Sequence, residues 1–156
     1  MLIASSFFLL FINSLTLSIS TFNLLFVAFK SSLDFDRKII KIPSTISKRI
    51  DYLEFVANNY EHDIIISTGM TDVHYEQWIL DKFKRNEKLY LLQCNSAYPT
   101  PRQHCNLAMV KHYSKLSEKN SRIVAGYSSH DIGNLGCQLA VACGAKMIEK
   151  HVKYGP

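Results

Sequence analysis

The feature that most constrains the fold is a regular alternation of two kinds of segment after residue 37. Short runs rich in Ile, Val and Leu end in polar or turn residues, and a helix-length amphipathic stretch follows each of the first four. The expected strands cover residues 38–42, 63–67, 89–94, 123–127 and 146–151. The expected helices cover residues 48–58, 73–85, 105–119 and 134–143. Because a crossover between parallel strands needs about a dozen residues, this alternation predicts an α/β fold with a parallel sheet.

Two α/β architectures fit this pattern: part of a (β/α)8 TIM barrel and an open, doubly wound sheet. The strands read as continuous apolar runs, which is typical of a sheet covered on both faces. No glycine-rich phosphate-binding turn follows any strand, and this disfavours a nucleotide-binding open sheet. At 156 residues the chain is shorter than the roughly 250 residues of a complete barrel, so a barrel here would be partial.

The composition narrows the class of protein. Hydrophobic residues make up 47% of the chain and charged residues 20%, as in a globular protein. The formal charge of +5 is scattered, without a basic stripe interleaved with aromatic residues, so no nucleic-acid partner is predicted. The cysteines lack zinc-site spacing and are expected to be buried, reduced thiols of a cytoplasmic protein without a chemical role. They are Cys94, Cys105, Cys137 and Cys143.

The first 36 residues differ from the remainder and are expected to form a separate segment. No charged residue occurs between Leu2 and Phe29, and Lys30, Arg37 and Lys38 follow. One interpretation is a membrane segment at residues 2–29 that leaves the C-terminal part in the cytoplasm. The other is an apolar piece of the barrel, and repeated Ser, Thr and Asn residues make the segment a poor membrane span.

Polar side chains occur where each expected strand ends. In α/β folds the carboxyl ends of the strands surround the ligand, so these side chains predict a binding site. The candidates, in chain order, are Lys41, Ser44, Ser67, Ser96, Tyr98, Ser128, His130, Glu149 and His151.

The residue types indicate the chemistry of this site. A lysine surrounded by hydroxyl groups suits a phosphate or carboxylate. His130 and His151 come from adjacent strand ends and suit a divalent metal, although two histidines alone are an incomplete ligand set. Glu149 and His151 are two residues apart on a strand and share a face, whereas Lys150 points the other way.

Five motifs at these strand ends resemble the sialic acid synthase family, whose members make N-acetylneuraminic, legionaminic and related nonulosonic acids. The resemblance covers residues 37–155 and implies strands four to eight of the barrel, its C-terminal half. The motifs are KIPS at 41–44, STGM at 67–70, LLQCNSAYPTP at 91–101, GYSSH at 126–130 and IEKH at 148–151.

The resemblance implies a transferase that condenses phosphoenolpyruvate with an N-acetylated hexosamine aldehyde and releases phosphate. Tyr98 would touch the sugar, and His130 and His151 would bind Mn²⁺ or Mg²⁺. Glu149 would belong to the catalytic site and support it from beside the histidines. Family members commonly form homodimers. The implied phosphoenolpyruvate ligands are Lys41, Ser44, Ser67, Ser96 and Ser128.

Two departures from the family pattern keep a second hypothesis open. Members usually carry Asp where this chain has Ser129, and Asp131, two residues later, is not expected to reach the same place. The family's catalytic acidic residue and a second lysine have no counterpart in residues 1–36. The alternative is therefore a non-catalytic, truncated or membrane-tethered fragment. An aldolase using Lys41 as a Schiff base is disfavoured, because that chemistry needs a desolvated amine.

Overall fold

The computed structural model describes residues 39–152 of the chain, and the predictions for residues 1–36 lie outside this range. Five strands form one parallel sheet whose spatial order follows the sequence. An open doubly wound sheet reverses its strand order at a switch point, so the sequential order identifies part of a barrel. The strands are β1 (Ile39–Ile42), β2 (Asp63–Ser67), β3 (Leu89–Cys94), β4 (Ile123–Ser129) and β5 (Met147–Lys150).

A contact between the two outermost strands shows that the sheet is curled. In a flat sheet, β1 and β5 would lie four inter-strand spacings apart, or roughly 19 Å. Lys41 Nζ on β1 nevertheless lies 2.5 Å from Glu149 Oε2 on β5. These two side chains cannot bridge the flat distance, so the sheet bends toward its polar face as a barrel wall does.

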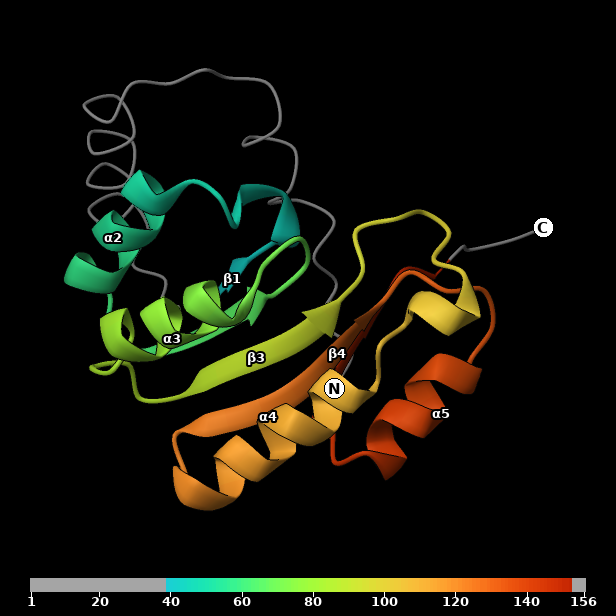
Figure 1. Cartoon of the computed structure of the whole chain (residues 1–156). Coiled ribbons are helices and arrows are strands. Elements are labelled where there is room, and N and C mark those ends of the chain that lie inside the picture. Colours follow the sequence, from blue (N-terminus) through green and yellow to red (C-terminus); the bar gives the residue numbers. More distant parts are fainter. Residues whose placement is uncertain (1–38, 153–156) are drawn as a thin grey trace. The chain divides into compact units, whose positions relative to one another are not determined.

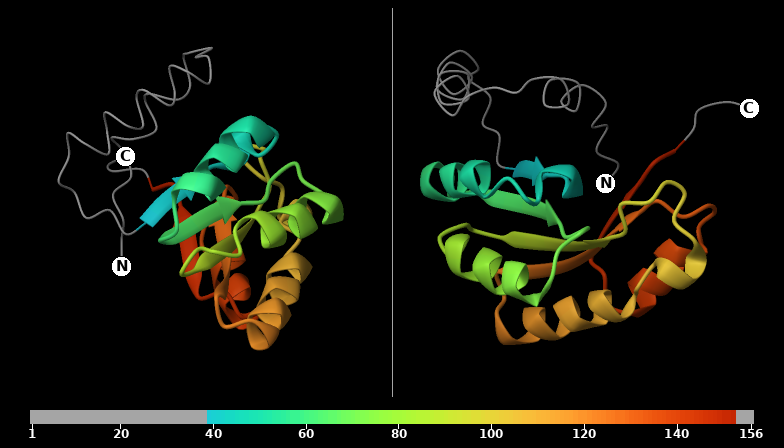
Figure 2. Two further views of the ribbon diagram at one scale, coloured as in Figure 1. Left: turned by 90° about the vertical axis from the view of Figure 1, so that its left-hand side faces the viewer. Right: turned by 45° about the horizontal axis from the view of Figure 1, so that its top comes forward.

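The helices cover the outer, convex face of this wall, where they follow one another around the sheet (Figures 1 and 2). Asp72 caps α3, since its Oδ1 accepts a hydrogen bond from the backbone N–H of Tyr75 at 2.9 Å, as the sequence predicts. The helix after β3 begins three residues later than expected, because Asn106 has a φ of 49° and interrupts it. The α-helices are α2 (Ile50–Asn59), α3 (Val73–Lys82), α4 (Ala108–Lys119) and α5 (Leu135–Ala142), and the 3₁₀ turns are η1 (Ser44–Ile46) and η2 (Arg102–His104).

The two faces of the sheet carry different side chains. The outer face is apolar and packs on α2, α3 and α4 through residues such as Ile64, Leu91 and Phe83. On the inner face, the register places Cys94 beside Ser128 and Ser128 beside Glu149. Ser67 lies on this face because it pairs with Leu92, which is two residues before Cys94 in β3. Lys41 also lies on it, because it pairs with Ile65, which is two residues before Ser67 in β2. We name the five inner-face residues the inner row: Lys41, Ser67, Cys94, Ser128 and Glu149.

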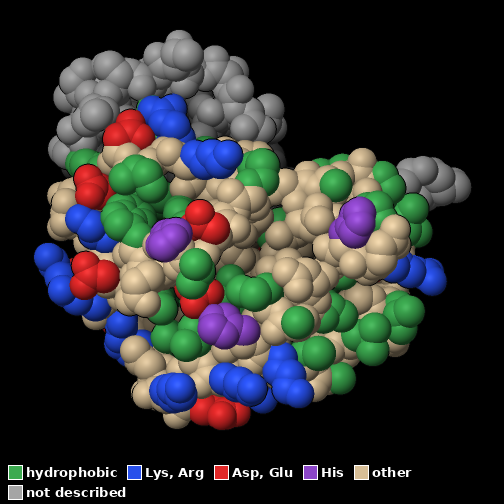
Figure 3. Space-filling model, viewed as in Figure 1, with side chains coloured by type: hydrophobic (Ala, Val, Ile, Leu, Met, Phe, Trp, Pro, Cys, Tyr) green, Lys and Arg blue, Asp and Glu red, His purple; other side chains and the backbone are tan. Residues whose placement is uncertain are grey.

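The helix-covered surface is not uniform. Charged side chains of both signs lie over α2, α3 and α4, whereas hydrophobic side chains gather over α5 (Figure 3). Leu135 and Leu139 of that helix are each 46% exposed. Within residues 39–152, no helix combines the length and apolar character that a membrane crossing requires.

Candidate functional site

The inner row places a charged pair at the carboxyl edge of the sheet. Lys41 and Glu149 form the ion pair between β1 and β5, and their side chains are 28% and 37% exposed. Both groups therefore remain accessible to a ligand. The expectation that Glu149 and Lys150 face opposite sides is correct, because Lys150 contacts Ser129 and Asp131 instead.

Predicted serine residues gather beside this pair. The Ser96 hydroxyl lies 3.1 Å from the buried Ser44 hydroxyl, which comes from the turn after β1. The Ser67 hydroxyl is buried and has no hydrogen-bond partner within residues 39–152. Gly69 permits this close packing, since a Cβ there would lie 2.8 Å from Ser44 Cβ. The STGM motif thus needs its glycine for space.

Cys94 lies at the centre of the inner row, although the sequence analysis gave it no role. Its Sγ is 3.8 Å from Ser44 Oγ and 4.0 Å from His130 Nδ1. Burial raises the pKa of the Cys94 thiol, and hydrogen bonds with Ser44 and Ser128 oppose that rise only in part. The thiol is therefore protonated at neutral pH. Its strand parity, two residues beyond Leu92 in β3, is the sequence signal that points to this position.

Tyr98 lies between the two predicted metal ligands. Its hydroxyl oxygen is 2.6 Å from His130 Nε2 and 3.0 Å from His151 Nε2. His130 Nδ1 lies 2.6 Å from the carbonyl oxygen of Asn95. Because a carbonyl only accepts, Nδ1 carries the proton and His130 Nε2 offers its lone pair. Tyr98 therefore donates to His130 and accepts from His151.

The surroundings of His130 favour its neutral form. Burial lowers the pKa of His130, and the nearby positive charge of Lys41 and the His151 ring lower it further. The hydrogen bond to Asn95 and the charge of Glu149 oppose the shift without cancelling it. A neutral imidazole is the form that binds a metal.

The two histidines direct their Nε2 atoms toward the same place. Both Nε2 atoms approach one point, which the Tyr98 oxygen marks. Across the described part of the chain, no group of three or more His, Cys, Asp or Glu residues is close enough to hold an ion. An ion held by His130 and His151 would therefore need water or substrate oxygens to complete its shell.

Asp131 lies on the outer side of the same strand ends, in the bend that follows β4. Its Oδ1 lies 2.6 Å from the Ser129 hydroxyl and 3.1 Å from the Tyr127 hydroxyl. The bend therefore brings the carboxylate back to the side chain of Ser129. Burial tends to raise the pKa of Asp131, but the hydrogen bonds from Ser129 and Tyr127 and the charge of Lys150 together lower it below its usual value.

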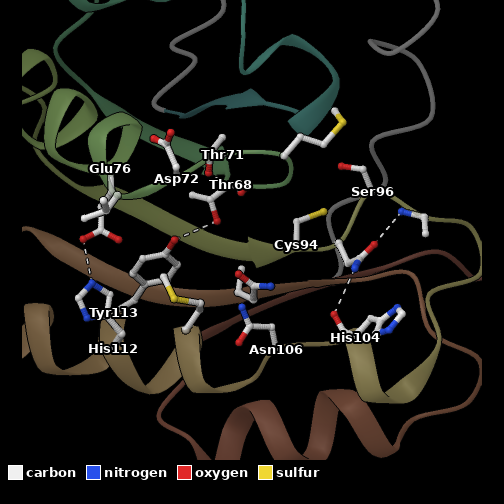
Figure 4. Close-up of a pocket in the computed structure, with 16 residues that line it drawn as sticks. Thr68, Thr71, Asp72, Glu76, Cys94, Ser96, His104, Asn106, His112 and Tyr113 are labelled. Atoms are coloured by element: carbon white, nitrogen blue, oxygen red, sulfur yellow. Dashed lines mark hydrogen bonds and ion pairs between the residues drawn. The ribbon is translucent and has the colours of Figure 1, made fainter.

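A hollow of about 810 Å³ opens between the loops after β2 and β3 and the first turns of α3 and α4. Figure 4 shows Cys94 and Ser96 on its wall. Because Cys94 belongs to the inner row, the hollow adjoins the inner row. The Glu76–His112 pair, 2.8 Å apart, joins the two helices across it. This hollow is not predictable from the sequence, because its residues come from segments that only the fold brings together.

Comparisons with known proteins agree with this geometry. The model of the NeuB family matches residues 13–155, a range that begins before the first of the five motifs. The N,N'-diacetyllegionaminic acid synthase of Legionella pneumophila is 37% identical over 120 residues, which cover 73% of this chain and 32% of that protein. The N-acetylneuraminate-9-phosphate synthase of Drosophila melanogaster is 32% identical over 114 residues, covering 72% of this chain and 30% of that protein.

A solved structure is also similar. The N-acetylneuraminic acid (sialic acid) synthetase of Leptospira borgpetersenii, determined in complex with citrate, has a TM-score of 0.66 and 29% identity. The similarity covers 87% of this chain and 44% of that one. The chain spans about a third of the length of the curated relatives described above.

Proposed function

The chain belongs to the NeuB family, and we propose that it forms the phosphoenolpyruvate- and metal-binding part of a nonulosonic acid synthase. The relatives are named as synthases of legionaminic and neuraminic acids, which supports this class of reaction. In the proposed reaction, C3 of phosphoenolpyruvate bonds to the aldehyde carbon of an N-acetylated hexosamine. Water adds at C2, and the bond from C2 to the phosphate oxygen breaks.

The observation that supports this proposal most is the buried Ser67 hydroxyl, on the same face as Lys41, for which residues 39–152 provide no hydrogen-bond partner. An unsatisfied buried hydroxyl costs about 1–3 kcal/mol, and an anion oxygen would accept its hydrogen bond. Lys41 supplies the compensating charge, and Ser44, Ser96 and Ser128 supply further hydroxyl groups. The Leptospira relative was determined with citrate, a polycarboxylate, which is compatible with an anion site in the family.

The histidines and Tyr98 have distinct roles in the proposal. His130 and His151 would hold Mn²⁺ or Mg²⁺ through their Nε2 atoms. When bound, the metal would polarise the acceptor aldehyde. Tyr98, whose hydroxyl contacts both Nε2 atoms, would lie beside the sugar. Glu149 would hold the Lys41 ammonium toward the anion through their ion pair.

Phosphoenolpyruvate binding tests the proposal directly. We expect ³¹P NMR titration of the 156-residue chain to detect binding. Lys41→Met should weaken it by about tenfold or more, because one charge-assisted contact contributes about 1.5–3 kcal/mol. Ser67→Ala should weaken it by a smaller factor. The matched controls are Lys146→Met, at the opposite end of β5, and Ser117→Ala on α4, and equal losses in the controls would contradict the proposal.

Turnover is a separate measurement. We propose that phosphate release is impaired in this chain, because residues 1–36 contain no recognisable counterpart of the family's acidic residue and second lysine. Phosphoenolpyruvate, Mn²⁺ and N-acetylmannosamine would be incubated with the chain, and a full-length relative would serve as the positive control. Binding without turnover supports the proposal, whereas loss of both favours the non-catalytic alternative. The cytoplasmic location and the homodimer stay predictions.

A further inference from the structure

A network of polar side chains lies behind the two histidines, on the outer side of β4 and β5. From its contacts, we propose that Lys150, together with Ser129 and Asp131, is a positioning device that fixes His130 and His151 relative to each other. The network itself is defined by its hydrogen bonds. The inference rests on the proposed function only for the ligand that the two histidines would bind.

Lys150 contacts the residues on both sides of His130. Its Nζ donates to Ser129 Oγ at 2.8 Å and to the backbone carbonyl oxygen of Asp131 at 2.7 Å. Lys150 is also the residue immediately before His151. The ammonium group of Lys150 therefore binds the chain on both sides of His130. The backbone of the same residue leads directly into His151.

The backbone ladder does not provide this link. The last register pair between β4 and β5 is Ser129 with Lys150, and both histidines lie one residue beyond it. The backbone N–H of Thr100 donates to the His130 carbonyl oxygen at 3.0 Å, but that bond ties His130 to the loop after β3. Within residues 39–152, the His130 and His151 rings contact each other with centroids 5.5 Å apart. Tyr98 on the inner side and Lys150 on the outer side add polar links between the two segments.

The network is built from compatible charges. The Ser129 hydroxyl accepts from the Lys150 ammonium and donates to the Asp131 carboxylate, so it bridges opposite charges. Ser129 is 1% exposed and Asp131 5%. Gly136 leaves room for the carboxylate, since a Cβ there would lie 2.6 Å from Asp131 Oδ2. Buried and mutually satisfied groups of this kind hold a backbone rigidly.

NMR of the complete 156-residue chain with ¹⁵N-labelled histidine tests the proposal. In the wild type, we expect His130 as the Nδ1–H tautomer, with nuclear Overhauser effects from the Tyr98 ring to both histidine rings. Lys150→Met should remove the effects between Tyr98 and His151, whereas the Nδ1–H tautomer of His130 should persist, because the Asn95 carbonyl sets it. Lys146→Met, the same substitution four positions earlier on an exposed side chain, should change neither.

His112 is an internal reference for folding, because its pair with Glu76 lies on α3 and α4, away from the network. Loss of the nuclear Overhauser effects between Tyr98 and His151, with the His112 signal unchanged, supports the positioning role of Lys150. If Lys150→Met keeps both Tyr98 contacts, or Lys146→Met loses them equally, the proposal is overturned. A wild type without the two contacts also overturns it.

Moving the carboxylate from position 131 to position 129 should restore the Tyr98–His151 contact, which a purely structural role does not predict. Asp131→Asn and Ser129→Ala should each weaken the Tyr98–His151 contact, by less than Lys150→Met does. The double variant with Ser129→Asp and Asp131→Ser keeps one carboxylate on the same face and puts it directly against Lys150. We expect this exchange to restore the contact, and an exchange variant that behaves like Lys150→Met contradicts the proposal.

Mn²⁺ titration separates this inference from the proposed function. We expect Mn²⁺ to broaden the His130 and His151 signals, with roughly tenfold more needed in Lys150→Met, because partners behind metal ligands typically change affinity by this factor. If Mn²⁺ broadens neither signal in any variant, the metal part of the proposed function fails. The Tyr98 contacts still decide whether Lys150 positions the histidines.

Discussion

The amino and carboxyl edges of the sheet use similar polar residues in different ways. At the amino edge, Asn86 and Arg122 bind backbone carbonyl groups. Asn86 Nδ2 donates to the carbonyl oxygens of Tyr60 and His62, each at 2.9 Å, and Arg122 donates to the carbonyl oxygen of Asn86 at 2.7 Å. These bonds join the loops that precede β2, β3 and β4.

At the carboxyl edge, inner-face side chains mainly bind one another. Lys41 pairs with Glu149, and Tyr98 lies between His130 and His151. Side-chain pairs of this kind can exchange partners when a ligand arrives, whereas backbone carbonyl groups are fixed by the fold. The amino edge therefore stabilises the chain, whereas the carboxyl edge carries side chains that a ligand could engage, as the carboxyl edges of other barrels do.

The largest expected effect is at the amino edge. Asn86→Ala should lower the free energy of unfolding by about 2–3 kcal/mol, because two hydrogen bonds and the packing of a buried amide are lost. Removal of Asn86 Oδ1, which has no partner within residues 39–152, offsets only part of this loss. Urea denaturation measures this change. Asn59→Ala is the control, since Asn59 is exposed and its amide binds only within its own helix. A loss of less than about 1 kcal/mol would show that the amino edge does not depend on Asn86.

The second prediction concerns the outer face of the carboxyl edge, where Tyr113 is buried like a core residue. Burial raises the pKa of Tyr113 to about 12, and its hydroxyl donates to Thr68 Oγ1 at 3.0 Å. Because this pKa exceeds the ordinary value of about 10, the stabilisation is complete below pH 10 and is lost as the pH rises through 12. Urea denaturation should show a fall of about 2 kcal/mol from this group over that interval.

Tyr113→Phe is the matched variant for the alkaline transition. It should reduce the pH dependence of the unfolding free energy without removing it, since the pKa of Tyr60 is also raised to about 12. A variant with the same pH dependence as the wild type would assign the transition to other groups. In that case, the outer face of the carboxyl edge would not behave as core.

A matched pair of cation replacements gives a smaller effect. Arg122→Met should cost about 1 kcal/mol of unfolding free energy, because the carbonyl groups of Phe83 and Asn86 lose the guanidinium as a donor. Lys41→Met should change it by less than about 0.5 kcal/mol, since Glu149 is partly exposed and water can replace the ion pair. Thermal denaturation compares the two, and equal losses would remove the distinction between the edges.

The smallest effect has the opposite sign. Ser67→Ala should leave the free energy of unfolding unchanged or raise it by up to about 0.5 kcal/mol, because the buried hydroxyl has no partner within residues 39–152. Thr68→Val, one residue later, is the control and should destabilise, since Thr68 Oγ1 donates to the Leu92 carbonyl oxygen at 3.1 Å. Destabilisation by Ser67→Ala would mean that this serine contributes to the core.

Much of this arrangement was predictable from the sequence. Residues 63–67 and 89–94 are strands with the expected bounds, because their apolar runs end sharply in polar residues. The Asp72 cap was also predictable, since it depends on a local hydrogen bond. Parity along β5 correctly separated Glu149 from Lys150. Helix ends were less accurate, as at Asn106, whose left-handed backbone has no clear signal in the neighbouring residues.

The alternation of strands and helices and the polar residues at the strand ends follow from the sequence, because both depend on near neighbours. The curl that brings Lys41 to Glu149, the place of Cys94 among the serines, and the contact of Lys150 with Ser129 emerge from the fold. These contacts join residues far apart in the chain and depend on how strands and loops meet in space. A residue's type limits its possible partners, and the fold selects among them.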